Sequence, residues 1–146
     1  MLSFHESNKA DATVACMEVP LKEASSFGIM TVNRKHAITA FTEKPEDPAP
    51  QPGKSSTALA SMGIYIFNRS HLIDVLRKDA EDESSSHDFG HDILPSLLGK
   101  AKVFAYPFGG KGGRVTQDRY WRDVGTLDAY YEASMALLEA VPPMDL

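Results

Sequence analysis

Two short segments place charged side chains at the ends of expected strands, where α/β proteins bind their ligands. In the first, Phe41–Pro45, the two-residue period of a strand puts Phe41 and Glu43 on one face and Thr42 and Lys44 on the other. A carboxylate and an ammonium group at such an edge could bind sugar hydroxyls and a phosphate group, respectively. From the spacing alone, a structural Glu–Lys pair at the edge of the sheet is the favoured interpretation.

The second segment, Tyr120–Thr126, contains Asp123 at the end of a short strand-like run, followed by Gly125 and a helix-capping threonine. A carboxylate in this place could bind Mg²⁺ while phosphate oxygens complete the coordination shell. One carboxylate is a weak signal by itself. An ion pair between Asp123 and a nearby Arg or Lys is therefore favoured without further information.

Three other features could carry chemistry but favour structural interpretations. The loop Gly109–Arg114 lacks the Gly-Lys-Ser/Thr ending and the following helix of a phosphate-binding loop, so we expect a mobile loop. His87 and His91 have the spacing of zinc ligands on a helix, but no clear third ligand accompanies them. Cys16 lies in an apolar strand, where a buried, unreactive thiol is expected.

The elements that must position these residues follow from hydrophobic periodicity and from the Gly and Pro residues. A helix is expected to begin at each of three capping residues, Ser70, Asp88 and Thr126, and Pro95 should kink or split the second of these helices. Residues 45–57 are rich in proline and predict an exposed loop. The pattern also predicts a helix over 2–9 and strands over 12–19, 28–32, 38–43, 58–67, 103–108 and 120–124, with a hairpin joining the second and third strands. Strands mixed with helices indicate the α/β class.

The composition limits the classes of protein to which the chain could belong. Its 146 residues, 42% hydrophobic and 24% charged, fit one globular domain. A net charge of −5 argues against a nucleic-acid-binding protein or one that binds anionic membranes. The single cysteine favours a reducing compartment, and we find no signal peptide and no apolar run that could span a membrane, so a cytoplasmic location is expected.

Taken together, the motifs resemble the sugar-phosphate nucleotidyltransferases, and most narrowly the ADP-glucose pyrophosphorylase branch of that family. The order of the motifs and the gaps between them match as well as the residues do, over nearly the whole chain. The matching segments are Thr13–Pro20, Ala24–Met30, Phe41–Pro45, Ala60–Phe67, Ser85–Gly90 and Tyr120–Leu127.

The resemblance implies a role for each candidate residue. Glu43 would hydrogen-bond glucose hydroxyls, Lys44 would neutralise the phosphate of glucose 1-phosphate, Gly28 would let the backbone approach the sugar, and Ser61 would add a further contact. Asp123 would be one of two Asp ligands for Mg²⁺, so Lys44 and Asp123 are the expected catalytic residues. In the family reaction, a glucose 1-phosphate oxygen attacks the α-phosphorus of ATP, ADP-glucose forms for glycogen or starch synthesis, and pyrophosphate leaves.

The resemblance also implies a fold and an extent. Residues 1–146 would form one partial domain, the C-terminal half of a Rossmann-like nucleotidyltransferase domain, with a mixed, mostly parallel sheet flanked by helices. The N-terminal nucleotide loop of the family and its C-terminal β-helix have no counterpart here. Three alternatives remain open: a catalytic fragment, an inactive sugar-phosphate-binding or assembly module, and a relative that uses another nucleotide or sugar. Exposed apolar surface on a half-domain leads us to expect a homo-oligomer.

Overall fold

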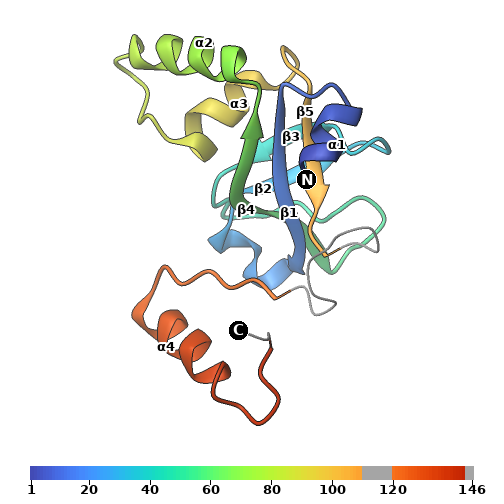
Figure 1. Cartoon of the computed structure of the whole chain (residues 1–146), viewed down its shortest axis with the longest axis vertical. Helices are drawn as coiled ribbons and strands as arrows, with labels where there is room; N and C mark the ends of the chain where they lie inside the picture. The colour runs from blue at the N-terminus through green and yellow to red at the C-terminus, as the bar shows by residue number, and fades with distance from the viewer. Residues whose placement is uncertain (110–119, 144–146) are drawn as a thin grey trace. The chain divides into compact units, whose positions relative to one another are not determined.

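A computed structural model describes residues 1–109 and 120–143 of the chain (Figure 1). They belong to two compact units, Met1–Pro107 and Phe108–Leu146. The first unit contains a five-stranded sheet with helices on both of its faces. The second contains one described helix, α4 (Leu127–Ala136).

The sheet is built around a strand that is buried on both faces. Residues 12–16 of this strand are all buried, and the hydroxyl of Thr13 lies 2.8 Å from Nδ1 of the buried His5. This confirms the strand predicted for 12–19, and it confirms coverage of both faces over residues 12–16, whereas Glu18 is exposed. The strands are β1 (Ala12–Pro20), β2 (Ile29–Val32), β3 (Ile38–Thr42), β4 (Thr57–Phe67) and β5 (Val103–Pro107), in the spatial order β3-β2-β4-β1-β5.

Strand direction differs in part from the expectation. The mixed α/β sheet is confirmed, but only β1 and β5 pair in parallel, whereas the β1–β4, β2–β3 and β2–β4 pairs are antiparallel. A mostly parallel sheet is therefore wrong for the strands that the structure describes. The reason lies in the connections: a tight turn joins β2 to β3, and the loop 43–56 brings β4 in beside β2.

Local sequence explains the β2–β3 hairpin. The Asn33 side chain accepts hydrogen bonds from the backbone N–H groups of Lys35 (2.9 Å) and Ala37 (3.1 Å), which closes the turn. The hairpin confirms the prediction for 28–32 and 38–43. The proline-rich segment that follows β3 is also a loop, as predicted, and its one bridge joins Gln51 to Lys54.

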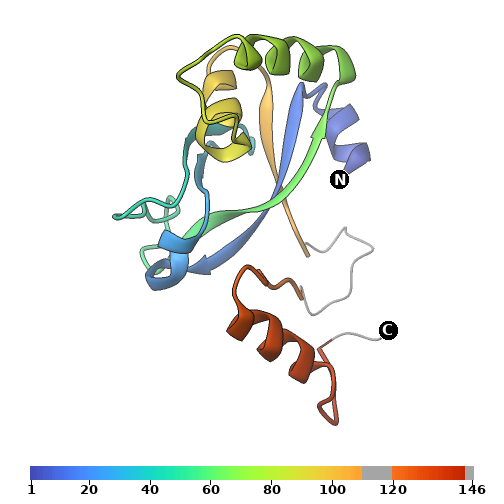
Figure 2. The same cartoon turned by 90° about the vertical axis from the view of Figure 1, so that its left-hand side faces the viewer.

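Helices cover the two faces of the sheet, as Figure 2 shows for α1 and α3 on opposite sides. Phe4 of α1 packs edge-on against Phe104 and Tyr106 of β5, with ring centroids 6.3 and 5.4 Å apart. On the other face, the main core joins Ile93 and Leu94 to residues of β1 and β3. The helices of the first unit are α1 (Leu2–Ser7), the 3₁₀ helix η1 (Leu21–Ser26), α2 (Arg69–Ala80), the π-helical turn η2 (Phe89–Ile93) and α3 (Leu94–Leu97).

The helical segment that follows Asp88 behaves as its sequence predicts. Asp88 is its N-cap, and the helix is divided into η2 and α3 beside Pro95, which stands in the first turn of α3. Gly99 follows with a φ of +76°, a conformation that glycine adopts readily at a helix end. The predicted cap, split and end of this segment are all confirmed.

Two local predictions are wrong. Helix α2 begins at Arg69 with Asn68 as its N-cap, rather than at Ser70, and the Asn68 side chain donates a hydrogen bond to the carbonyl of Ala10 (2.9 Å). The run 120–124 forms no strand, because no strand of the described chain pairs with it. The Thr126 cap of α4 is confirmed, since its hydroxyl accepts from the backbone N–H of Ala129 at 3.1 Å. None of the helices in the described ranges is both long and apolar enough to cross a membrane.

Candidate functional site

The end of β3 places Glu43 and Lys44 as the alternation predicts. Phe41 is buried and Glu43 half-buried, whereas Thr42 and Lys44 are exposed. The backbone N–H of Lys44 donates to the carbonyl of Phe27 at 3.1 Å, and Lys44 adopts a left-handed φ of +43°. The chain therefore turns sharply as it leaves the sheet, with the ammonium group of Lys44 on the solvent side.

Ser61 and Gly28 lie beside this edge. The backbone N–H of Ser61 on β4 donates to the carbonyl of Gly28 at 2.8 Å, next to the start of β2. The β1–β4 register shifts just after Ser61, where Gly63 has a φ of +69° and donates to the Ser61 hydroxyl at 3.3 Å. This irregularity in β4 lies between Ser61 and Tyr65.

The Glu43 carboxylate lies between two glycines. A Cβ atom added to Gly28 would come within 2.6 Å of both Glu43 Oε2 and the Phe41 ring. A Cβ atom on Gly90 would overlap the same oxygen and would lie 2.9 Å from Glu43 Cδ. The structure thus brings Gly28, Glu43, Lys44 and Ser61 into one neighbourhood, and adds Gly90 to it.

Burial and a second carboxylate set the electrostatics of this site. Burial raises the pKa of Glu43, and the negative charge of Asp88 raises it further, whereas Lys44 and His91 act in the opposite direction. Burial also raises the pKa of the Tyr65 hydroxyl; Glu43 and Asp88 add to that rise and a hydrogen bond with Ser61 opposes it. The site therefore combines two carboxylates, a phenol and a hydroxyl with an exposed cation at its margin.

The turn that carries Asp88 and Gly90 is held by several hydrogen bonds. One carboxylate oxygen of Asp88 accepts from the backbone N–H groups of Gly90 and His91, both at 2.8 Å. Asp92 in turn accepts from the backbone N–H of Asp88 at 3.1 Å. On its inner side, the Phe89 ring stacks on Tyr65 with centroids 5.5 Å apart.

This packing explains why the spacing of residues could not assign Asp88, Gly90 and Tyr65 to the Glu43 site. Asp88 follows Glu43 by 45 residues in the sequence, and the packing of η2 and α3 against β3 brings the two together. The available signal was the Asp88 cap, which predicts a helix start but gives no partner for it.

The histidine pair does not form a metal site. His87 precedes η2 with a φ of +59°, so it does not share a helix face with His91. Each histidine instead pairs with one aspartate, His87 with Asp79 at 2.8 Å and His91 with Asp92 at 2.9 Å. Across residues 1–109 and 120–143, no group of three or more His, Cys, Asp or Glu side chains could hold a metal ion.

The remaining predicted residues are Cys16, Asp123 and the loop Gly109–Arg114. Cys16 is fully buried, and burial together with the charge of Glu18 raises its thiol pKa to about 12, which confirms the unreactive interpretation. Asp123 is exposed in the second unit, where Gly125 follows closely enough that its Cβ would lie 3.4 Å from an Asp123 oxygen. Beyond residue 109, the loop Gly109–Arg114 lies outside the described residues.

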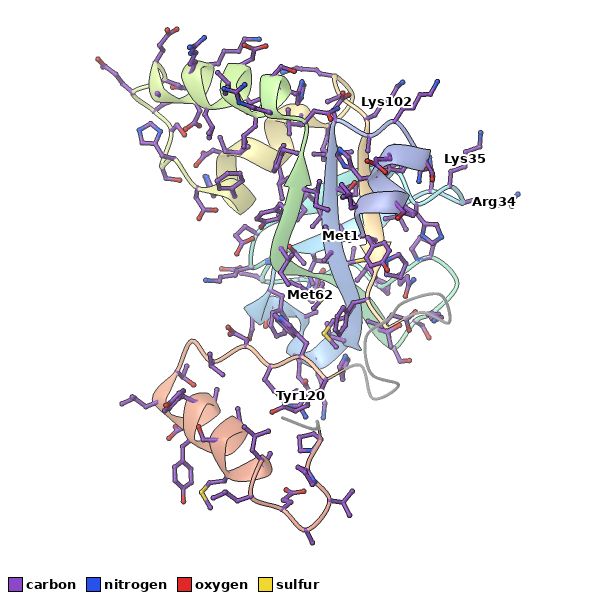
Figure 3. All side chains as sticks on the ribbon, viewed as in Figure 1. Met1, Arg34, Lys35, Met62, Lys102 and Tyr120 are labelled. Atoms are coloured by element: carbon purple, nitrogen blue, oxygen red, sulfur yellow. The ribbon has the colours of Figure 1, made fainter. Side chains whose placement is uncertain are left out.

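Other polar surfaces of the first unit lie elsewhere. Figure 3 labels Arg34 and Lys35, which project from the turn at the opposite end of the β2–β3 hairpin from Glu43. A pocket of about 570 Å³ lies between α2 and the η2–α3 segment, and it contains none of the predicted site residues. Its Asp79 carboxylate is already bonded to Ser85 and His87.

Comparison with known proteins decides the family. The nucleotidyl transferase family model matches residues 1–140, nearly the whole chain. The chain belongs to this family. It is 53% identical over 146 residues to glucose-1-phosphate adenylyltransferase 2 of Vibrio parahaemolyticus, covering 100% of the chain and 36% of that protein.

Other relatives give the same result. Over 147 residues the chain is 52% identical to the glucose-1-phosphate adenylyltransferase of Methylobacillus flagellatus, and over 151 residues it is 49% identical to that of Nitrosococcus oceani. Each alignment covers 100% of the chain but 34% of the relative. This nucleotidyl transferase chain thus spans about a third of the length of the curated relatives it matches.

Proposed function

We propose that this chain is the sugar-phosphate-binding part of a glucose-1-phosphate adenylyltransferase. The observation that carries the proposal is the half-buried Glu43 carboxylate beside the exposed Lys44, in a chain about half identical to relatives of that name. The reaction is the attack of a glucose 1-phosphate oxygen on the α-phosphorus of ATP, with release of pyrophosphate. Its product, ADP-glucose, would serve glycogen or starch synthesis.

Each of the four residues of the proposed sugar-phosphate site, Gly28, Glu43, Lys44 and Ser61, has its own role in binding. The Glu43 carboxylate accepts hydrogen bonds from sugar hydroxyls, and the Ser61 hydroxyl adds a further contact. The ammonium group of Lys44 neutralises the phosphate, whose charge would otherwise repel ATP. Gly28 leaves the space in which the carboxylate and the sugar meet. Alignment and charge neutralisation are the main demands of phosphoryl chemistry, so no covalent intermediate on the protein is needed.

Asp123 is the proposed ligand of Mg²⁺. Its carboxylate is exposed and accepts no hydrogen bond from any residue in the described part of the chain, which leaves both oxygens available to a hard cation. This fits one ligand position, and the other ligands would come from ATP phosphates and from outside these residues. The bound ion would neutralise charge on the phosphates.

A second candidate function follows from the extent of the chain, which matches about a third of each relative. By itself it would be an inactive sugar-phosphate-binding or assembly module, because much of the ATP site would lie outside it. A relative that uses another nucleotide or sugar is a further alternative, to be decided by substrate selectivity. A cytoplasmic location, without nucleic acid or membrane as a partner, stays a prediction.

Calorimetric titration with glucose 1-phosphate in the presence of Mg²⁺ tests the proposal. We expect saturable binding, weaker binding of galactose 1-phosphate, and strong loss of affinity in Lys44→Ala. Lys35→Ala, at the far end of the hairpin, is the matched control and should bind as the wild type does. Equal binding by wild type and Lys44→Ala would show that Lys44 takes no part in binding the sugar phosphate.

We also propose self-association. Apolar side chains in and just after α4 are exposed, with Leu127 88% and Leu138 76% accessible. Exposed apolar side chains gathered in one segment favour association between copies. Sedimentation should therefore show a species larger than the monomer, and a compact monomer at high concentration would contradict this expectation.

A further inference from the structure

We propose that Gly90 is a positioning residue for the sugar-phosphate site: its missing side chain leaves the space that the Glu43 carboxylate occupies. The effect that we expect on sugar binding rests on the proposed function. The position of the Glu43 carboxylate can be tested without it. Gly90 is far from Glu43 in the sequence, and neither spacing nor charge in the sequence indicates this role.

The first support is the close approach of Gly90 to Glu43. Gly90 is buried, and a Cβ atom there would overlap Glu43 Oε2, lie 2.9 Å from Glu43 Cδ and lie 3.3 Å from Asp88 Oδ1. Carbon atoms in ordinary contact need about 3.5–4.0 Å. Gly90 is not among the residues with positive φ, so it is the space, and not an unusual backbone conformation, that requires glycine here.

The second support is that hydrogen bonds and core packing hold the turn at Gly90 in place, so it cannot easily move away from Glu43. The backbone N–H groups of Gly90 and His91 are both bonded to Asp88 Oδ1, and the backbone N–H of Asp88 is bonded to Asp92. Immediately after the turn, Ile93 and Leu94 are each only 1% exposed and belong to the main core. A side chain at position 90 would therefore displace Glu43 rather than its own backbone.

The third support is the direction in which Glu43 could move. On its other side the carboxylate already lies close to Gly28, since a Cβ atom added to Gly28 would come within 2.6 Å of both Glu43 Oε2 and the Phe41 ring. The open direction is toward solvent. The displaced carboxylate would then lose burial and its alignment with the sugar hydroxyls, while Lys44 would keep its place.

The experiment compares Gly90→Ala with wild type in the 146-residue chain, using the Glu43 carboxyl pKa from carbon-13 NMR titration. Because burial is the first cause that raises this pKa, displacement toward solvent should lower it toward the ordinary value. Affinity for glucose 1-phosphate should fall by about tenfold or more, as expected for a lost hydrogen bond to a charged group. Ser96→Ala in the adjoining α3 is the control and should change neither quantity.

A background without the carboxylate separates positioning from a structural role in the turn. In Glu43→Ala, the further change Gly90→Ala should alter affinity and melting temperature much less than it does in the wild type, because only the 3.3 Å approach to Asp88 Oδ1 remains. If Gly90→Ala fails to fold, restored folding in the Glu43→Ala background supports the overlap, and failure in both backgrounds overturns it.

An unchanged Glu43 pKa in folded Gly90→Ala overturns the inference, as does equal loss of melting temperature in both backgrounds. A wild type that binds no glucose 1-phosphate, combined with a lowered Glu43 pKa in Gly90→Ala, would reject the proposed function and leave the positioning role in place. The two failures are therefore distinguishable.

Discussion

Asp88 has two separable effects, and substitution can measure each. Its carboxylate caps the η2 turn through two N–H···O bonds of 2.8 Å, and its charge helps to raise the pKa of Glu43. Asp88→Ala removes both effects. Asp88→Asn keeps a side-chain oxygen that can accept the same two bonds but removes the charge.

The expected magnitudes follow from the geometry. Loss of a helix N-cap costs about 1 kcal/mol, and this lowers the melting temperature of a chain of this size by roughly 2–4 °C. We therefore expect Asp88→Ala to melt about 2–4 °C below wild type, while Asp88→Asn melts close to it. Both variants should lower the pKa of Glu43, because a like charge no longer faces it.

Thermal unfolding followed by circular dichroism and NMR titration of Glu43 give the two readouts. Asp47→Ala in the exposed proline-rich loop is a control for the loss of an acidic side chain. The reasoning is refuted if Asp88→Ala melts as the wild type does, or if the Glu43 pKa is the same in all three proteins.

Three further predictions concern single residues. Glu43→Gln should be more stable than wild type at pH 7, because the raised folded-state pKa means that ionised Glu43 opposes folding; the gain should vanish as the pH falls below the ordinary value of 4.5. Urea unfolding at both pH values checks this, and equal stability at pH 7 would contradict it. Cys16 should resist a thiol-specific reagent at pH 8 until the chain is unfolded, given its pKa of about 12 and full burial; rapid labelling of the folded chain would disprove the buried-thiol account. Thr126→Ala should destabilise α4 by about 1 kcal/mol through loss of its cap, seen as reduced helical NMR shifts in residues that follow Thr126. Unchanged shifts there would show that the cap contributes nothing.

Elements with a strong local pattern could be predicted from the sequence. The buried run of β1 and the hairpin around Asn33 follow from apolar periodicity and turn chemistry, both of which act within a few residues. The division of the helix beside Pro95 follows from the missing proline N–H. These predictions needed no knowledge of tertiary packing.

The predictions that failed depended on distant partners. Asn68 and Ser70 are both capping residue types; the helix begins after Asn68, whose side chain bonds to the distant Ala10 and makes no cap bond to the helix. Strand direction is not encoded in a two-residue period, so the antiparallel β1–β4 and β2–β4 pairs could not be read from it. Residues 120–124 have the composition of a strand, but a strand also needs a neighbour.

Only the part of the candidate site that has a local pattern could be predicted from the sequence. Glu43 and Lys44 are adjacent in the sequence, and their alternation at a strand end is a local signal. Gly90 joins them only through the packing of η2 against β3, which no local pattern reports. The resemblance to nucleotidyltransferases supplied Gly28 and Ser61, for which spacing gave no reason.

The most direct test of the central claim is a nitrogen-15 NMR titration of the chain with glucose 1-phosphate. The account predicts saturable backbone shifts that concentrate at Gly28, Glu43, Lys44, Ser61 and Gly90, and that Lys44→Ala greatly weakens. Absence of saturable shifts at these residues, or shifts confined to the pocket between α2 and α3, would contradict the claim that they form a sugar-phosphate site.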